Sequence, residues 1–259
     1  MQEIIAGHYK SIDIFKNIRF VPDEHIYYLD DVIADSVTSI LKKYTKPFDQ
    51  AYWAKIKAPQ LGVSPEELIA NWELKAKLSR VKGTIVHSFI ENKISNSNFV
   101  YPQEQIIEMF GYDPIQDQLH QLIPQVEKFL LDIDQKMFPI ASEFIVGDKD
   151  FMVCGTVDQI FYNQKSGQLE IWDWKTNREI KTESKYFHLY ELAHIPDTEL
   201  DHYSLQLSLY KLILEKNTKV KFGKSYITWF NNFTQDYKIF MCKDYLYEAQ
   251  LILDKLHKG

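Results

Sequence analysis

The sequence predicts an α/β or α+β fold in which a central mixed β-sheet is flanked by helices. From residue 119 onward, segments with helical spacing of apolar residues alternate with segments rich in β-branched and aromatic residues. Their order is helix, three strands, helix, two strands, helix, which is typical of a sheet covered by helices. A chain of 259 residues with 45% hydrophobic residues can also bury a sizeable core.

The first 80 residues predict an N-terminal, mainly helical lobe. Strand-like pieces at 19–21 and 25–29 precede a helical pattern over 48–80, where Pro65 after Ser64 marks a first helical turn. We therefore divide the chain into a lobe at 1–80 and a core at 81–259, with one continuous domain as the alternative.

The core begins with a helix predicted over 83–91. His87 and Glu91 are four residues apart, so both lie on one face of this helix. The later elements are expected as a surface excursion over 94–118, a helix over 119–138, a strand over 141–146, a helix over 203–214, strands over 224–230 and 237–242, and a closing helix over 245–256.

The centre of the core is a predicted β-hairpin, residues 154–161 and 169–176 with a short turn between them. Side chains alternate along a strand, so Asp173 and Lys175 share a face, and pairing can bring Asp158 level with Asp173. Two acids and a lysine then converge. Such an arrangement suits a divalent cation with an ammonium group beside it.

Composition excludes several classes of protein. The net charge of −6 means that any nucleic acid must be bound through a local patch and metal ions. Two cysteines cannot hold a four-cysteine iron–sulfur cluster, and no phosphate-binding loop for a nucleotide is present. Without a signal peptide or an apolar run of about 18 residues, we expect a cytoplasmic protein that does not enter the membrane.

Four motifs occur in a characteristic order: Gly83-x-x-x-His87, Gly155-Thr-Val-Asp158, Asp173-Trp-Lys175-Thr176 and Gln206-x-x-x-Tyr210. Together they resemble the PD-(D/E)XK nuclease superfamily, and within it the RecB-type branch that includes phage and recombination exonucleases. The resemblance covers residues 81–215 and implies a restriction-endonuclease-like core. His25-x-Tyr27 is also similar to the phage members.

The resemblance implies a site for one or two Mg²⁺ or Mn²⁺ ions. By that match, Asp158, Asp173, His87 and the main-chain carbonyl of Trp174 are the metal ligands. Lys175 orients or deprotonates the attacking water and balances charge at the phosphate. An imidazole ligand favours Mn²⁺ without excluding Mg²⁺.

Further residues surround this expected centre. By the same resemblance, Gln206 and Tyr210 border the site and contact substrate or brace the ligands, although they could also form a self-satisfied buried pair. Arg178 and Lys181 directly follow Lys175 and are candidates for holding phosphates. Glu143 and Glu91 are expected to support the ligands, and Glu143 is a candidate for an additional ligand. These two groups complete the set of expected site residues.

The expected function is a metal-dependent DNA nuclease, more specifically an exonuclease of recombination, repair or phage DNA metabolism. The alternatives are a structure- or single-strand-specific endonuclease and a non-catalytic DNA-binding or regulatory protein that retains the fold. Linear DNA ends are the expected substrate. A recombination or single-strand-binding protein is a candidate partner, assembly into an oligomer stays open, and a phage-encoded protein would work in the host cytoplasm.

Overall fold

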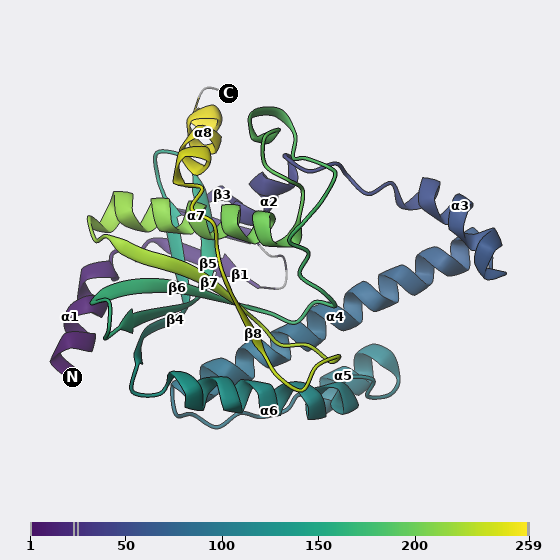
Figure 1. The fold of residues 1–259 in the computed structure, drawn as a ribbon, viewed down its shortest axis with the longest axis horizontal. Helices are drawn as coiled ribbons and strands as arrows, with labels where there is room; N and C mark the ends of the chain where they lie inside the picture. Colours follow the sequence, from purple (N-terminus) through teal and green to yellow (C-terminus); the bar gives the residue numbers. More distant parts are fainter. Residues whose placement is uncertain (1, 23, 25, 258–259) are drawn as a thin grey trace.

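A mixed eight-stranded sheet with helices on both faces forms the body of the protein, as the predicted fold class requires (Figure 1). The computed structural model describes residues 2–22, 24 and 26–257. His25, part of an expected strand and motif, lies outside the described residues. No helix among the described residues is both long and apolar enough to span a bilayer.

The strands follow the order β1-β2-β3-β5-β6-β7-β8, and β4 pairs with β5. Their bounds are β1 Ile18–Val21, β2 Ile26–Leu29, β3 Val32–Ser36, β4 Met137–Asp148, β5 Val153–Asn163, β6 Gln168–Lys175, β7 Phe222–Trp229 and β8 Lys238–Met241. The β4–β5–β6 meander is antiparallel, whereas β6 and β7 run parallel. The predicted hairpin is therefore the β5–β6 pair at the centre of the sheet.

The helices cover the segments that were expected to be helical, except that the helix expected over 119–138 ends at Ile133 and residues 137–138 belong to β4. Their bounds are α1 Gln2–Ile12, α2 Val37–Lys42, α3 Gln50–Leu61, α4 Pro65–Ile94, α5 Gln103–Phe110, α6 Gln116–Ile133, α7 Glu199–Thr218 and α8 Leu246–His257. The excursion predicted over 94–118 was wrong in part, because α5 buries Ile106 and ends at Gly111, whose φ of +78° suits a glycine. α1 was not anticipated.

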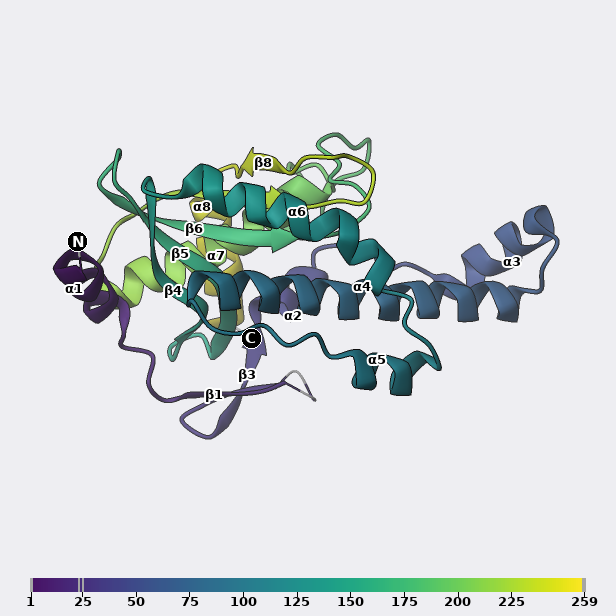
Figure 2. The same ribbon diagram turned by 90° about the horizontal axis from the view of Figure 1, so that it is seen from below.

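Two hydrophobic cores lie on opposite faces of the sheet. On one face, α7, α8 and α2 pack against residues such as Ile160 and Ile171. On the other face, α4 and α6 pack against Trp172 and Trp174, with Phe129 of α6 at the centre (Figure 2). The alternation along β6 thus sends its tryptophans to one core and leaves Asp173 and Lys175 on the α7 side.

An arm formed by the linker 43–49, α3 and α4 up to residue 82 projects from this body (Figure 1). Ala54 and Ala58 of α3 are fully buried, so the two helices pack closely. A capping box between Ser64 and Glu67 starts α4, which then runs without interruption across residue 80 into the body. The sheet likewise takes β1, β2 and β3 from the N-terminal side of that position.

Candidate active site

A cleft of about 960 Å³ opens where α4, the β5–β6 hairpin and α7 meet. Expected site residues at its wall are His87, Glu91, Glu143, Trp174 and Lys175. The cleft is therefore built from segments that are far apart in the sequence.

The register of the sheet aligns three carboxylates. In β4 and β5, Ser142 pairs with Gln159 and Phe144 with Val157, so Glu143 lies opposite Asp158. The β5–β6 pairing ends at Gln159 and Trp172, and one step further along the same register Asp158 lies opposite Asp173. At this point the Trp174 amide donates to Asp158 Oδ2 at 2.8 Å in place of a ladder bond.

His87 completes a group that could hold a metal ion. Its Nδ1 lies 3.5 Å from Asp158 Oδ2 and 3.7 Å from Glu143 Oε1. One ligand atom from each of the three residues lies within 4.8 Å of the others. Its Nε2 lies 3.0 Å from the Trp174 carbonyl oxygen, so Nε2–H donates there and Nδ1 is left facing the carboxylates.

The carbonyl oxygen of Trp174, which the resemblance implied as a metal ligand, thus accepts a hydrogen bond from the imidazole. Such a bond fixes the tautomer and orientation of a metal-binding histidine. Burial lowers the pKa of His87, but the neighbouring Asp158 and Glu143 outweigh this effect and raise it to about 9. Without a cation, the ring is therefore protonated at neutral pH.

Glu143 reaches this group through an unusual backbone. Its φ of +44° lies in the left-handed region, which costs energy for a residue with a Cβ atom. Ser142 and Phe144 pair with β5 on either side, but Glu143 itself forms no ladder pair, consistent with a local distortion of β4. Strained residues of this kind concentrate at functional sites.

Lys175 lines the cleft and forms an ion pair with Asp173, which is buried behind it. Asp173 is only 2% exposed, and burial raises its pKa to about 6 in spite of Lys175. Burial lowers the pKa of Lys175, but Asp173 and Asp158 outweigh burial and raise it above the ordinary value. The ammonium group also lies over the ring of Tyr203 from α7, 4.6 Å from its centre.

Gln206 and Tyr210 lie beneath β5 and do not line the cleft. Gln206 Nε2 donates to the Tyr210 hydroxyl at 3.2 Å, and both side chains are buried. A Cβ atom added to Gly155 would come within 2.4 Å of Tyr210 Cε1. This placement favours bracing of the strand that carries Asp158 over direct contact with a substrate.

The two basic residues expected to bind phosphate in the loop after β6, Arg178 and Lys181, lie in different surroundings. Arg178 lines a second hollow of about 440 Å³, which shares Ser79, Thr176 and Asn177 with the main cleft. Lys181 is instead paired with Glu179 and Glu199.

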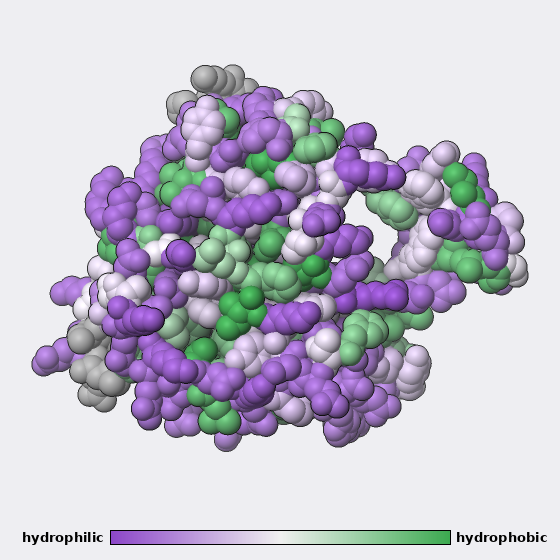
Figure 3. All heavy atoms as spheres, in the orientation of Figure 1, coloured by the Kyte–Doolittle hydropathy of each residue, from purple (hydrophilic) through white to green (hydrophobic). Residues whose placement is uncertain are grey.

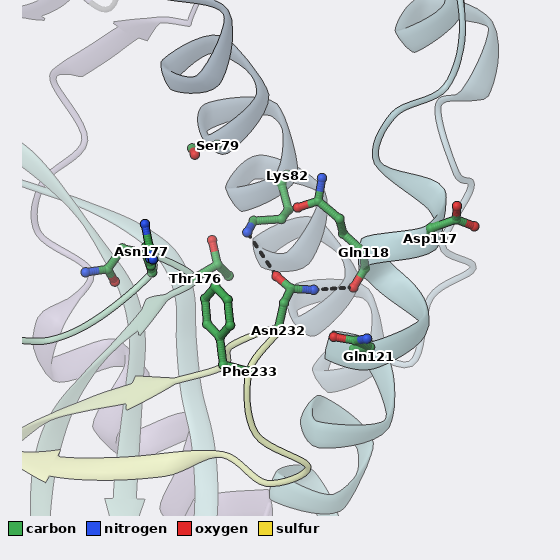
Figure 4. A pocket seen from close by; sticks show the side chains of 10 residues that line it. Ser79, Lys82, Asp117, Gln118, Gln121, Thr176, Asn177, Asn232 and Phe233 are labelled. Atoms are coloured by element: carbon green, nitrogen blue, oxygen red, sulfur yellow. Dashed lines mark hydrogen bonds between the residues drawn. The ribbon is translucent and has the colours of Figure 1, made fainter. Parts of the chain in front are cut away.

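The second hollow has a hydrogen-bonded wall formed by α4, α6 and the loop after β7. Lys82 Nζ donates to Asn232 Oδ1 at 3.2 Å, and Asn232 Nδ2 donates to the Gln118 carbonyl at 2.8 Å (Figure 4). Thr176, next to Lys175, faces the same hollow. The floor of the cleft thus continues into this hollow.

Sequence reasoning missed Tyr203, Arg80 and the Tyr27–Thr156 pair, which all belong to the cleft wall. Tyr203 could have been found, because it lies one helical turn before Gln206 on the same helix. Arg80 similarly lies two turns before His87 on α4. The contact between Tyr27 and Thr156 joins segments 129 residues apart, and no local sequence pattern predicts it.

Comparison with known proteins agrees with this geometry. The family model of the PD-(D/E)XK nuclease superfamily matches residues 60–239. The match covers more than half of the chain, so the protein belongs to the PD-(D/E)XK nuclease superfamily, and the resemblance seen in its motifs is confirmed. No curated protein matches the chain.

Solved structures support the fold. A candidate exonuclease from Eubacterium rectale matches with a TM-score of 0.50 at 18% identity, covering 86% of this chain and 77% of that one. The structure of SSO0001 matches with a TM-score of 0.32 at 13% identity, covering 72% of this chain and 84% of that one. At these identities the first likeness concerns the fold alone, and the second is too weak to support an argument.

The donor set fits a hard divalent cation, the kind of ion that nucleases of this superfamily use. Carboxylate oxygens suit Mg²⁺ and Mn²⁺, and one imidazole nitrogen is acceptable to Mn²⁺ in particular. Asp173 lies outside the group of three and is paired with Lys175 through Oδ2. The residues nearest to a bound cation would therefore be His87, Glu143 and Asp158.

Proposed function

We propose that this protein is a metal-dependent DNA nuclease that hydrolyses phosphodiester bonds, and that it acts as an exonuclease in recombination, repair or phage DNA metabolism. The observation that carries the proposal is a cluster of five ionisable groups at one cleft. His87, Glu143 and Lys175 line the cleft, and Asp158 and Asp173 lie behind them, paired with His87 and Lys175. Ionisable groups that share a cleft and perturb each other's pKa are typical of catalytic sites.

The proposed cation is Mg²⁺ or Mn²⁺, held by Asp158, Glu143 and Nδ1 of His87, with Asp173 available as a further ligand. When bound, such a cation polarises a phosphoryl oxygen and lowers the pKa of a coordinated water. Lys175, with its raised pKa, is an ammonium group at neutral pH. We assign it to stabilise negative charge at the phosphate and to orient the nucleophile, and not to remove its proton.

Arg178 and the second hollow offer a binding site for the part of the scissile strand that extends beyond the cleft. The hollow adjoins the cleft through Thr176 and Asn177, and it carries Arg178 and Lys82. Guanidinium and ammonium groups bind phosphate oxygens without reading sequence. We therefore propose Arg178 for substrate binding, whereas Lys181, which is neutralised by two glutamates, is the weaker candidate.

An end-dependent activity is in line with the fold that the chain shares with a candidate exonuclease. The decisive experiment incubates linear and covalently closed circular DNA with Mg²⁺, Mn²⁺ or EDTA. Linear DNA should be degraded with either cation and remain intact in EDTA. Lys175→Met and Asp173→Asn should lower the rate about 10³-fold or more.

Lys165→Met is the matched control, because Lys165 lies exposed in the β5–β6 turn. It should leave the rate unchanged. Equal, trace degradation by wild type and both site variants would contradict the nuclease assignment and favour a DNA-binding protein. Cutting of closed circles as fast as linear DNA would replace the exonuclease by the endonuclease alternative.

A further inference from the structure

An opening passes through the molecule between the arm and the body (Figure 3). The arm is defined here as residues 43–82: the linker 43–49, α3, and α4 up to the body. Figure 1 shows how the chain leaves α2 through the linker, turns at the end of α3 and returns along α4. The opening is therefore enclosed by continuous polypeptide on the side of the arm.

Contacts close the remaining sides. On the body side, the Leu189 amide donates to the Tyr44 carbonyl at 2.7 Å, and the rings of Tyr44 and Tyr190 meet edge-on at 6.2 Å. On the outer side, Phe48 of the linker meets Trp72 of α4 at 5.6 Å. The linker is thus fixed at both ends, to the loop after β6 and to α4.

The segments that border the opening also line the cleft. Ser79, Arg80 and Gly83 of α4 form part of its wall, as do Thr176 and Asn177 after β6. A strand that passes through the opening along α4 would therefore reach Lys175 and His87 next. The opening and the candidate active site form one path.

The arm differs in charge from the rest of the chain. It contains eight lysine and arginine residues and four acidic residues, a net charge of +4, whereas the whole chain has −6. Two of those acids serve helix ends: Asp49 caps α3 and Glu67 caps α4. Local positive charge on an acidic protein is the pattern expected where a polyanion must be bound.

Five of the eight basic side chains of the arm form no ion pair within the described residues, whereas Lys43 is paired with Asp35 and Lys77 and Lys82 donate hydrogen bonds to the body. Lys46, Lys55, Lys57, Lys75 and Arg80 are exposed, and none forms an ion pair with any residue in the described part of the chain. Many lysines of the body, by contrast, are paired with acids, as Lys243 is with Asp201. The charge of these five side chains is therefore free to neutralise phosphates.

Exposed aromatic rings accompany these charges. Phe48 is 65% exposed, Tyr52 55% and Trp53 40%. Base–aromatic stacking needs unpaired bases, since the faces of paired bases are covered within a duplex. Lysines interleaved with exposed aromatics thus favour single-stranded over double-stranded DNA.

We propose that the arm encloses single-stranded DNA, which enters the opening end-first and is led along α4 to the cleft. This proposal rests on the proposed nuclease function and adds its substrate form, a threaded single strand with a free end. Because the polypeptide surrounds the opening, a strand without a free end cannot enter.

Topological trapping tests the proposal. Wild-type protein in EDTA, and the Asp173→Asn variant separately, are bound to a linear single-stranded oligonucleotide that carries biotin at both ends. Streptavidin is added either after or before the protein, and excess unlabelled competitor follows. A threaded protein should stay on the DNA when streptavidin is added after it and should fail to bind when the ends are blocked first.

Two variants locate the effect in the arm. Lys55→Glu combined with Lys57→Glu should weaken binding of single-stranded DNA about tenfold and lower the slope of log affinity against log salt by about 1.4. Trp53→Ala should weaken binding about tenfold through lost stacking. Lys10→Glu combined with Lys165→Glu, an equal change of charge on the body, should leave binding and DNA degradation unchanged, and thermal unfolding checks that every variant is folded.

The outcomes separate this proposal from the nuclease assignment. Degradation of linear DNA together with binding that ignores the order of streptavidin addition overturns the arm proposal alone. If neither the wild-type protein in EDTA nor the Asp173→Asn variant binds single-stranded DNA, the arm proposal is also overturned, and the arm is left as a surface for a protein partner. Degradation that continues in EDTA contradicts the metal requirement, whereas order-dependent trapping would still support threading.

Discussion

Nε2 of His87 lies 3.0 Å from the main-chain carbonyl oxygen of Trp174, while Nδ1 of the same ring faces Asp158 at 3.5 Å. This one hydrogen bond connects α4 to β6 and determines which nitrogen faces the carboxylates. It links the helix of the arm directly to the strand that carries Asp173 and Lys175. A small rotation of α4 would therefore alter the ligand set of the candidate site.

The raised pKa of His87 predicts opposite pH effects on the free and metal-bound protein. Burial lowers this pKa, but Asp158 and Glu143 raise it to about 9. In the free protein, the stabilisation from this group is complete below the unfolded pKa of about 6.5 and is lost as pH rises through about 9.

A cation must displace the same proton, so Mn²⁺ affinity should rise about tenfold per pH unit between about pH 7 and 9. Thermal unfolding of the protein with and without MnCl₂ at several pH values measures both effects. His87→Gln should remove the pH dependence of Mn²⁺ binding. Affinity that stays constant over this range in the wild type would contradict the assignment of Nδ1 as a ligand.

Replacing Glu143 should separate stability from metal binding. Both Glu143→Gly and Glu143→Gln remove a negative charge that faces Asp158 and protonated His87. Only the glycine also relieves the backbone at φ +44°, so in the metal-free state Glu143→Gly should be more stable than Glu143→Gln by about 1 kcal/mol. Glu143→Gly should also reduce the stabilisation by Mn²⁺, because a ligand is lost. Glu143→Gln keeps the strained backbone. It should therefore lose the stabilisation by Mn²⁺ without becoming as stable in the metal-free state as Glu143→Gly. A glycine variant that is stabilised by Mn²⁺ as strongly as the wild type would show that Glu143 is not a ligand.

Gly155 should not tolerate a side chain while Tyr210 is present. A Cβ atom there would lie 2.4 Å from Tyr210 Cε1, so Gly155→Ala should destabilise the protein by about 2 kcal/mol in urea unfolding. Tyr210→Phe should not rescue this variant, because the clashing ring carbon remains. Tyr210→Leu alone should lower the free energy of unfolding. In the Gly155→Ala background it should lower it less, because it also relieves the clash. Additive losses would contradict a direct clash.

The sequence could predict those parts of the site that depend on local periodicity. Alternation along β6 separates Asp173 and Lys175 from the flanking tryptophans, and hairpin pairing brings Asp158 opposite Asp173. Helical spacing likewise puts His87 and Glu91 together on α4. The sheet with flanking helices follows from the same two periods, which is why the fold class was correct.

The remaining features depend on tertiary structure that no local pattern encodes. The positive φ of Glu143 belongs to a distorted strand and cannot be read from a glutamate in a β-rich segment. The hydrogen bond from His87 to the Trp174 carbonyl, the group expected as a metal ligand, forms because α4 passes directly beside β6, and no local pattern indicates it. The opening beside the arm similarly requires the contact between Tyr44 and Leu189, two residues in separate loops.

Asp201 should stabilise the fold in a pH-dependent way at the start of α7. It is fully buried and accepts hydrogen bonds from Lys243 at 2.7 Å, Tyr245 at 2.6 Å and Thr198 at 2.8 Å. Burial raises its pKa, but these three donors outweigh burial and hold the pKa below the ordinary value. The group joins α7, which presents Tyr203 to the cleft, to the segment that leads into α8.

Because the folded pKa is lowered, the stabilisation from Asp201 is present above the unfolded pKa of about 3.9 and is lost as pH falls through the folded pKa. Asp201→Asn should therefore cost about 1–2 kcal/mol at neutral pH, since it weakens three hydrogen bonds to a buried carboxylate, while Lys243, whose side chain is 47% exposed, can turn to water. The difference in unfolding free energy between wild type and variant should stay constant from about pH 8 to 5 and narrow below about pH 4. Asp254→Asn, at an exposed position on α8, controls for a general effect of removing a carboxylate. A difference that is small at neutral pH, or that grows on acidification, would mean that the Asp201 carboxylate does not hold α7 in place.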